Sequence, residues 1–246
     1  MQTSALDPYA LITLLIMMVI LPLVGVWDFQ RLLRWMDEGR SDARTKTYTW
    51  ILFMEWGLVL GLGGWWFAAG RGLEPLGLVP VASGWQWLAL GLGLAATAFM
   101  VWQMFAVLGS SEQLGQAREQ MGSLGGLAPR NPGEDRQFVL VSITAGVCEE
   151  FLYRGVLMAV LTSVVGLWPA VGLSSVIFGL GHAYQGVAGI GKTALVGLAM
   201  ALLTVFSGSL FVAMVLHAVV DLTSGRIMAA ALRTAPQADD LEIQAT

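Results

Sequence analysis

Several apolar stretches, each close to twenty residues long, constrain the fold of this chain more than any other feature. A bilayer core is about 30 Å thick, and a helix needs ~20 mostly apolar residues to cross it. The composition agrees, because 56% of the residues are hydrophobic and only 12% are charged, with a mean hydropathy of +0.70. The sequence therefore predicts an all-α, polytopic bundle of transmembrane helices in a lipid bilayer.

Hydropathy and helix-breaking residues predict about seven membrane helices. Their approximate bounds are 9–27, 48–69, 85–108, 138–164, 169–182, 193–206 and 210–224. The long connection after the third span is polar and rich in Gly, Ser and Pro, which favours an interfacial loop. We expect a single membrane domain over 1–246 with three parts: a three-helix part at 9–136, motif-bearing helices at 137–225 and a polar cytoplasmic tail at 226–246.

Basic residues predict the orientation of the chain. Eleven of the 13 Lys and Arg residues fall in the connections after the first, third and fifth spans, or after the last span. The positive-inside rule places those connections in the cytoplasm. We therefore expect an N-terminus outside, a C-terminus in the cytoplasm and a location in the plasma membrane.

Two kinds of partner are disfavoured. The formal net charge of −4 leaves no basic surface for the phosphates of a nucleic acid. The segment GVAGIGKT at 186–193 fits the pattern of a phosphate-binding loop. Such a loop follows a β-strand in a soluble α/β unit, whereas this segment joins two predicted membrane helices. We expect neither a nucleic acid nor a nucleotide.

A few ionisable side chains lie deep inside the predicted spans. A charge at mid-bilayer costs at least ~2.5 to 3.5 kcal/mol, so such groups usually face a cavity or one another. They are Glu55, Glu149, Glu150, Arg154, His182, His217 and Asp221. Nothing near Glu55 forms a pattern, and helix packing or an ion path explains it equally well.

Spacing separates the roles of the residues in the fourth span. Glu150 and Arg154 are four residues apart, so on a helix they share a face and can form an ion pair. Glu149 points about 100° away from Glu150. One carboxylate therefore neutralises the arginine, and the other stays free.

Two more pairs have the same four-residue spacing. Asp221 lies one helical turn after His217, so the aspartate either orients the imidazole or lines the same wall. Phe178 lies one turn before His182, a spacing more typical of packing than of chemistry. We expect Phe178, like Glu150 and Arg154, to support the site.

Counting residues along each span places these polar side chains at similar depths in the membrane. At 1.5 Å per residue, Glu149 lies ~17 Å and His217 ~19 Å from the cytoplasmic side. His182 and Asp221 come out at ~10 Å and ~13 Å. We therefore expect a polar intramembrane cavity that opens toward the cytoplasm.

The chemistry of this set favours hydrolysis. A glutamate in an apolar cavity can accept a proton from water, and imidazoles can share that role or donate to an oxyanion. Amide hydrolysis then needs no covalent intermediate. The alternative is a Zn²⁺ site made of Glu149, His182 and His217 with water in the open position. We favour a mechanism without a metal or other cofactor.

Three segments resemble the motifs of a known family: EEFLYR at 149–154, FGLGH at 178–182 and HAVVD at 217–221. Their types and order are similar to the EExxxR, FxxxH and HxxxN/D motifs of the CPBP family of CAAX-processing and bacteriocin-processing intramembrane proteases. The resemblance covers roughly 138–224. It implies an all-helical membrane fold related to the Ras-converting enzyme.

The resemblance also implies roles for single residues. Glu149 and His182 would activate water, while His217 and Asp221 would occupy the positions that stabilise the oxyanion. The prenyl-protein enzymes of this family carry Asn at the Asp221 position. Because an ionised Asp cannot donate a hydrogen bond, Asp221 must be protonated or must orient His217. Prenyl-CAAX specificity therefore does not follow from the motifs.

Two functions fit these observations. The first is an intramembrane endopeptidase that cleaves a hydrophobic or lipidated peptide or protein. The alternative is a non-catalytic relative, such as an immunity or scaffold protein, that binds a hydrophobic peptide in the same cavity. The four polar positions Glu149, His182, His217 and Asp221 favour the enzyme, because a binding protein would not need to bear their insertion cost.

Overall fold

The computed structural model describes residues 7–80, 84 and 86–234, which form helices and turns and contain no strand. Five of its helices are long and apolar enough to cross a membrane, and α9 is a shorter apolar helix. These observations confirm the predicted helical membrane bundle. The end of the third long helix at residue 108 and the start of the last at residue 210 agree with the bounds expected from hydropathy, but the first extends to Asp37 and the last to Arg233, where ends at 27 and 224 were expected.

Two long rods form the N-terminal part of the bundle. The first consists of α1 (Pro8–Leu15), a π-helical turn η1 (Ile16–Ile20) and α2 (Leu21–Asp37). The second consists of α3 (Ala43–Leu58), a π-helical turn η2 (Val59–Gly63) and α4 (Gly64–Ala68). The side chain of Asp7 caps the first rod by accepting a hydrogen bond from the backbone of Ala10 at 2.7 Å.

The third long helix and its connection follow. Helix α5 (Gln86–Leu108) leads to the short α6 (Ser111–Met121) and a 3₁₀ turn, η4 (Gly122–Leu127). Trp85, which we took as the start of this span, lies outside the described residues. The polar connection is thus partly helical, contrary to our expectation of a loop. Ser110 caps α6, and Leu114 and Met121 bury their side chains against Ala231 of the last helix.

The fourth rod lies at the centre of the molecule. It consists of α7 (Pro132–Glu150), a π-helical turn η5 (Phe151–Leu157) and α8 (Met158–Val165). The side chain of Asn131 caps it by accepting hydrogen bonds from the backbones of Gly133 and Glu134, each at 3.0 Å. Every residue of η5 is buried. Five of its side chains, Phe151, Leu152, Tyr153, Val156 and Leu157, belong to the main hydrophobic core.

Three helices complete the bundle: α9 (Leu167–Gly181), α10 (Gly186–Ser207) and α11 (Leu210–Arg233). The segment 186–193, which fits the phosphate-loop pattern, forms the first turns of α10. Gly208, with a φ of +68°, ends α10 in the left-handed conformation that glycine adopts most readily. Helix α11 continues to Arg233, so the start of the expected polar tail is helical, and residues 235–246 lie outside the described residues.

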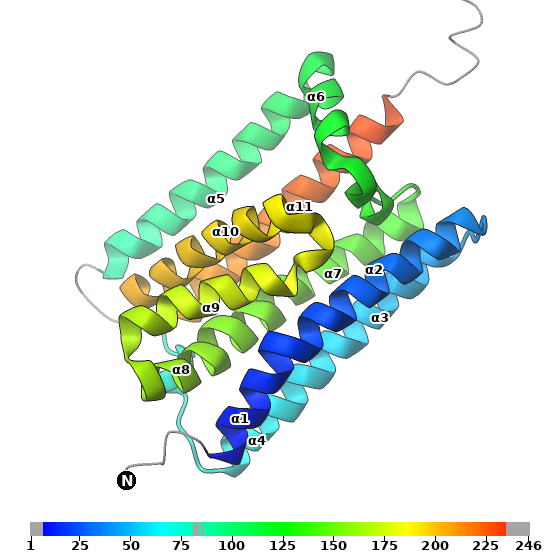
Figure 1. Ribbon diagram of the computed structural model, residues 1–246. Coiled ribbons are helices and arrows are strands. Elements are labelled where there is room, and N and C mark those ends of the chain that lie inside the picture. The colour runs from blue at the N-terminus through cyan, green and yellow to red at the C-terminus, as the bar shows by residue number, and fades with distance from the viewer. Residues whose placement is uncertain (1–6, 81–83, 85, 235–246) are drawn as a thin grey trace, which may run out of the picture.

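The helices are arranged so that the central rod is covered on several sides. In Figure 1 the α1–α2 and α3–α4 rods lie together at one side and α5 lies at the opposite side. Between them, α3 packs on α7, α7 on α11, and α9 on α10. This arrangement encloses the C-terminal ends of α7 and α9 and the middle of α11, where the polar motifs lie.

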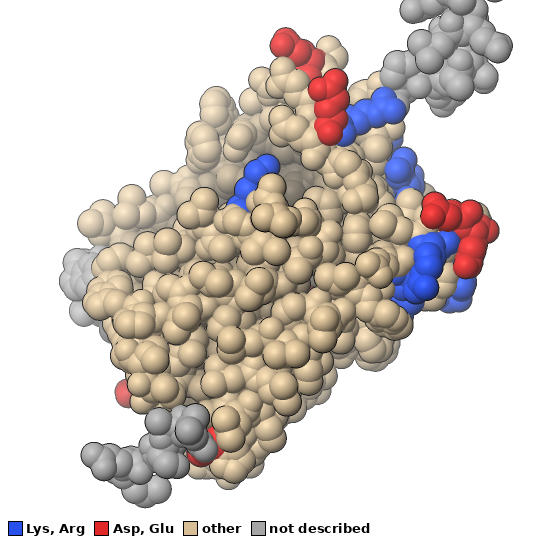
Figure 2. Space-filling view, viewed as in Figure 1, with Lys and Arg blue, Asp and Glu red and all other residues tan. Residues whose placement is uncertain are grey.

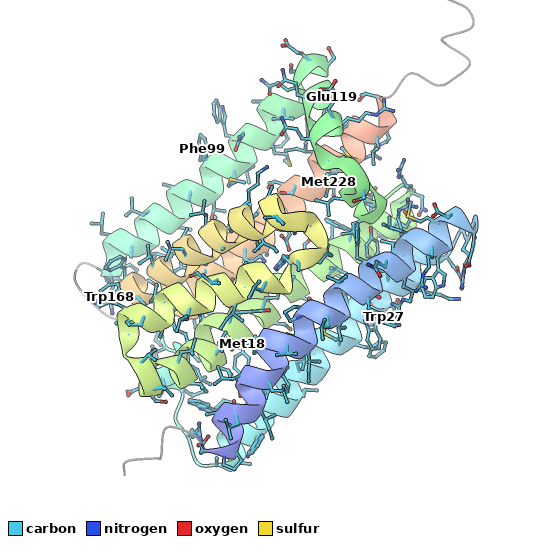
Figure 3. All side chains as sticks on the ribbon, in the orientation of Figure 1. Met18, Trp27, Phe99, Glu119, Trp168 and Met228 are labelled. Atoms are coloured by element: carbon cyan, nitrogen blue, oxygen red, sulfur yellow. The ribbon has the colours of Figure 1, made fainter. Side chains whose placement is uncertain are left out.

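The outer surface suits a lipid environment. Phe99, which projects outward from α5 in Figure 3, is 56% exposed, and Leu92 and Trp102 on the same helix are exposed as well. Figure 2 shows a broad face over the middle of the bundle that is almost entirely uncharged. Exposed apolar side chains over this area are expected where lipid tails replace water.

One close helix contact provides a test of the packing. A Cβ atom at Gly146 of α7 would lie 2.7 Å from the backbone oxygen of Met214 and 2.8 Å from the backbone nitrogen of Ala218, both in α11. Backbone atoms cannot give way easily, so Gly146→Ala should destabilise the protein by about 1–3 kcal/mol, measured as a lower melting temperature in detergent. Gly172→Ala is the matched control, because no atom lies within 4 Å of its added Cβ. Equal melting temperatures for the two variants would contradict the contact.

Candidate active site

A fully buried ion pair lies at the base of the candidate site. Nη1 of Arg154 donates to Oε1 of Glu150 at 2.8 Å, and both side chains are completely buried. Nη2 of Arg154 donates to the backbone oxygen of Gly197 in α10 at 3.0 Å. The pair expected from the four-residue spacing is therefore present, and it also connects the central rod to α10.

The same glutamate holds a histidine of a different helix. Nδ1 of His217 in α11 donates to Oε1 of Glu150 at 2.7 Å. Asp221, which we considered as the group that orients this imidazole, is farther away, with Oδ2 3.8 Å from Nε2 of His217. Glu150 therefore orients His217, while Asp221 is placed beside the opposite nitrogen.

Glu149 faces both histidines of the chain. Its Oε2 lies 3.9 Å from Nε2 of His182 and 3.9 Å from Nε2 of His217. This oxygen is buried and has no hydrogen-bond partner among the described residues. Nδ1 of His182 donates to the backbone oxygen of Phe178 at 3.0 Å, which turns Nε2 toward the glutamate. The three groups thus converge from α7, from the end of α9 and from α11.

The ring of Phe178 packs against Arg154 of the buried ion pair and against both histidines. Its ring lies 4.1 Å from the guanidinium carbon of Arg154, and the ring centroids of His182 and His217 lie 4.7 Å and 5.8 Å away. The aromatic face stabilises the cation, and the ring fixes the spacing of the two imidazoles. The packing role expected for Phe178 is accordingly a role in building the site.

The converging groups line a cavity of about 410 Å³ among α3, α7, α9, α10 and α11. A smaller groove of about 140 Å³ adjoins it between α2 and α3. Lys192 lies on the cavity wall, and the space-filling view shows a hollow beside α6 with a basic side chain at its edge (Figure 2). Residues that line both spaces are Ile51, Glu55, Leu127, Glu149, His182 and Tyr184.

Two residues of the site could not be assigned from the sequence. Glu55 of α3, which we left as an isolated charge, lines the cavity with Glu149 and is 5% exposed. Gly197 is needed because a Cβ there would lie 2.9 Å from Cδ1 of Phe178 and 3.0 Å from Nη2 of Arg154. The only sequence signal for Glu55 was its charge within an apolar span, and Gly197 gave none.

The donor atoms do not form a zinc site as they stand. Tetrahedral zinc with bonds of about 2.0–2.1 Å brings its ligand atoms within about 3.3 Å of one another. Oε2 of Glu149 is 3.9 Å from both Nε2 atoms, and the described residues contain no group of three His, Cys, Asp or Glu that could hold a metal ion. We therefore derive no step through a metal.

The fold and the site define an integral membrane protein with a buried polar centre of carboxylates and imidazoles. Residues 136–223 match the model of the type II CAAX prenyl endopeptidase family, described as Rce1-like. This match covers 88 of the 246 residues, includes all three motifs and confirms the resemblance drawn from them. No curated protein and no solved structure matches the chain.

The buried ion pair yields a test by double substitution. Glu150→Met or Arg154→Met alone leaves an unpaired buried charge, which should lower stability by ~3 to 5 kcal/mol. The double variant restores neutrality in an apolar setting and should recover much of this loss, as measured by thermal unfolding in detergent. Its activity should stay low, because His217 has lost the acceptor for Nδ1. Additive losses in the double variant would show that the two side chains are not coupled.

Proposed function

We propose that this protein is an intramembrane endopeptidase that hydrolyses a peptide bond in a hydrophobic, membrane-associated peptide or protein. The observation that carries the proposal is the position of Oε2 of Glu149, 3.9 Å from both imidazole Nε2 atoms and on the wall of a cavity within the membrane bundle. A water molecule hydrogen-bonded to this oxygen is within reach of an imidazole as well. The family match supports the same class of reaction.

In this mechanism Glu149 is the general base. It takes a proton from water as the water oxygen attacks the carbonyl carbon of the substrate. Nε2 of His182 accepts a second hydrogen bond from this water and holds it in line. Its Nδ1 is committed to the backbone oxygen of Phe178, so the ring keeps one orientation.

The developing oxyanion is assigned to His217. Glu150 accepts the Nδ1 proton of His217, and as an imidazolium this residue donates its Nε2 proton to the oxyanion. Asp221 lies 3.8 Å from Nε2 and supplies negative charge that favours the imidazolium. The aspartate then acts through His217 and does not itself need to donate a hydrogen bond.

The orientation proposed for the chain has the C-terminus in the cytoplasm. Lys and Arg side chains gather at the end of the molecule formed by the α2–α3 turn, α6 and the end of α11 (Figure 2). The positive-inside rule places this end in the cytoplasm. The cavity then opens toward the cytoplasm near Lys192.

Removing the general base should abolish hydrolysis without affecting folding. Glu149→Gln is nearly isosteric but cannot accept the proton of water, so turnover should fall by at least about 10²-fold while the melting temperature stays within a few degrees. His182→Gln should lower turnover as well. The measurement is proteomic detection of cleaved membrane peptides, with wild type and variant at equal abundance. Normal turnover by Glu149→Gln would overturn the assignment. If the wild type also produced no cleaved peptides, the peptide-binding alternative would be favoured.

Metal analysis tests the metal-free mechanism. Because Glu149 and the histidines are spaced more widely than zinc ligands, purified active protein should contain far less than one zinc per chain and should keep its activity after chelation. The measurement is elemental analysis beside an activity assay. One tightly held zinc per chain, lost together with activity on chelation and restored on re-addition, would contradict the proposed mechanism.

A further inference from the structure

Glu55 is a buried carboxyl that the proposed reaction has not yet used. It lies on α3, outside the segment that matches the family model, and its side chain is 5% exposed. Its Oε2 is buried and has no hydrogen-bond partner among the described residues. The insertion of such a group into a membrane helix is costly, and no cation in the described parts of α3 is placed to neutralise it.

The position of Glu55 relates it to the reacting groups. Helix α3 packs on α7, and Glu55 and Glu149 line both the main cavity and the adjoining groove. His217 and Asp221 line the same main cavity. A peptide that runs from the cavity into the groove passes both carboxyls.

Two carboxyls in one enclosed cavity do not both ionise readily, because like charges repel strongly where water is scarce. Asp221 lies 3.8 Å from Nε2 of His217 and can stay ionised beside an imidazolium, whereas Glu55 forms no ion pair among the described residues. With Glu149 as the ionised base, the proton therefore resides on Glu55. The pair then has the composition needed for amide hydrolysis, with one base for the water and one acid for the leaving amine.

We propose that Glu55 is the general acid that protonates the leaving amine during peptide cleavage at Glu149. This inference rests on the proposed function and adds a residue to it. Water gives one proton to Glu149, and its oxygen forms a bond to the carbonyl carbon. The C–N bond then breaks as Glu55 gives its proton to the nitrogen. The proton on Glu149 returns to Glu55 through water in the cavity, so the net reaction consumes one water and yields an acid and an amine.

A change of leaving group tests this role. The probes are a quenched peptide that the wild type cleaves and its thioester analogue, in which sulfur replaces the scissile N–H. A thiolate leaves without protonation near neutral pH, whereas an amine does not. Glu55→Gln should lower kcat on the amide by roughly 10²-fold or more and change kcat on the thioester by less than about threefold.

The controls separate this inference from the proposed function and from misfolding. Glu149→Gln should hydrolyse neither the amide nor the thioester, because both reactions need an activated water. Glu134→Gln removes another buried carboxyl, one that accepts a hydrogen bond from the backbone of Arg130 and lines neither the cavity nor the groove, and should keep the wild-type ratio of amide to thioester turnover. Melting temperatures in detergent show whether each variant is folded.

A second variant tests the same role by chemical rescue. Glu55→Ala leaves space for a small acid, so a formate buffer at pH about 5, in which part of the added formate is formic acid, should restore part of the amide turnover relative to a formate-free buffer of the same pH and leave thioester turnover unchanged. Equal losses on both substrates, unchanged amide turnover in Glu55→Gln, or no response of folded Glu55→Ala to formate would each overturn the assignment.

Discussion

One carboxylate oxygen organises this site. Oε1 of Glu150 accepts a hydrogen bond from Arg154 at 2.8 Å and another from His217 at 2.7 Å, and it does so in a position with no exposure. An isolated charge there would be strongly destabilising, so the partners are a condition for the helix to insert at all. Because His217 belongs to α11 and Arg154 also bonds to Gly197 of α10, the neutralised charge holds three helices in register.

Neighbouring glutamates serve opposite purposes because a helix turns by about 100° per residue. Glu150 points into the packed interior, where its charge is compensated, while Glu149 points into the cavity with a free oxygen. Glu150 fixes the rotation of the rod, and this rotation directs the side chain of Glu149 into the cavity. Phe178 packs against the guanidinium of Arg154 and the ring of His182, so a smaller side chain would loosen both at once.

The sequence allowed predictions about single helices better than about contacts between them. Spacing within one helix predicted the pairing of Glu150 with Arg154, because residues four apart share a face. It could not show that His217 pairs with Glu150, since periodicity says nothing about the neighbouring helix that a face meets. Depth along the helix placed Glu149 and His217 at one level, yet the role of Glu55 depends on how α3 is rotated against α7. Helix α6 was missed because its apolar side chains are few and gain their burial from the neighbouring helices α5 and α11.

Asp221 illustrates how a change at one position depends on its neighbours. An asparagine there can donate its own hydrogen bond to an oxyanion, and an ionised aspartate cannot. In this chain Oδ2 of Asp221 and Oε2 of Glu149 lie 3.8 Å and 3.9 Å from the same nitrogen of His217, whose other nitrogen donates to Glu150. Three carboxyls therefore surround one imidazole. In the proposed mechanism, His217 donates the hydrogen bond that an asparagine would donate directly, and the aspartate contributes its charge to that donor.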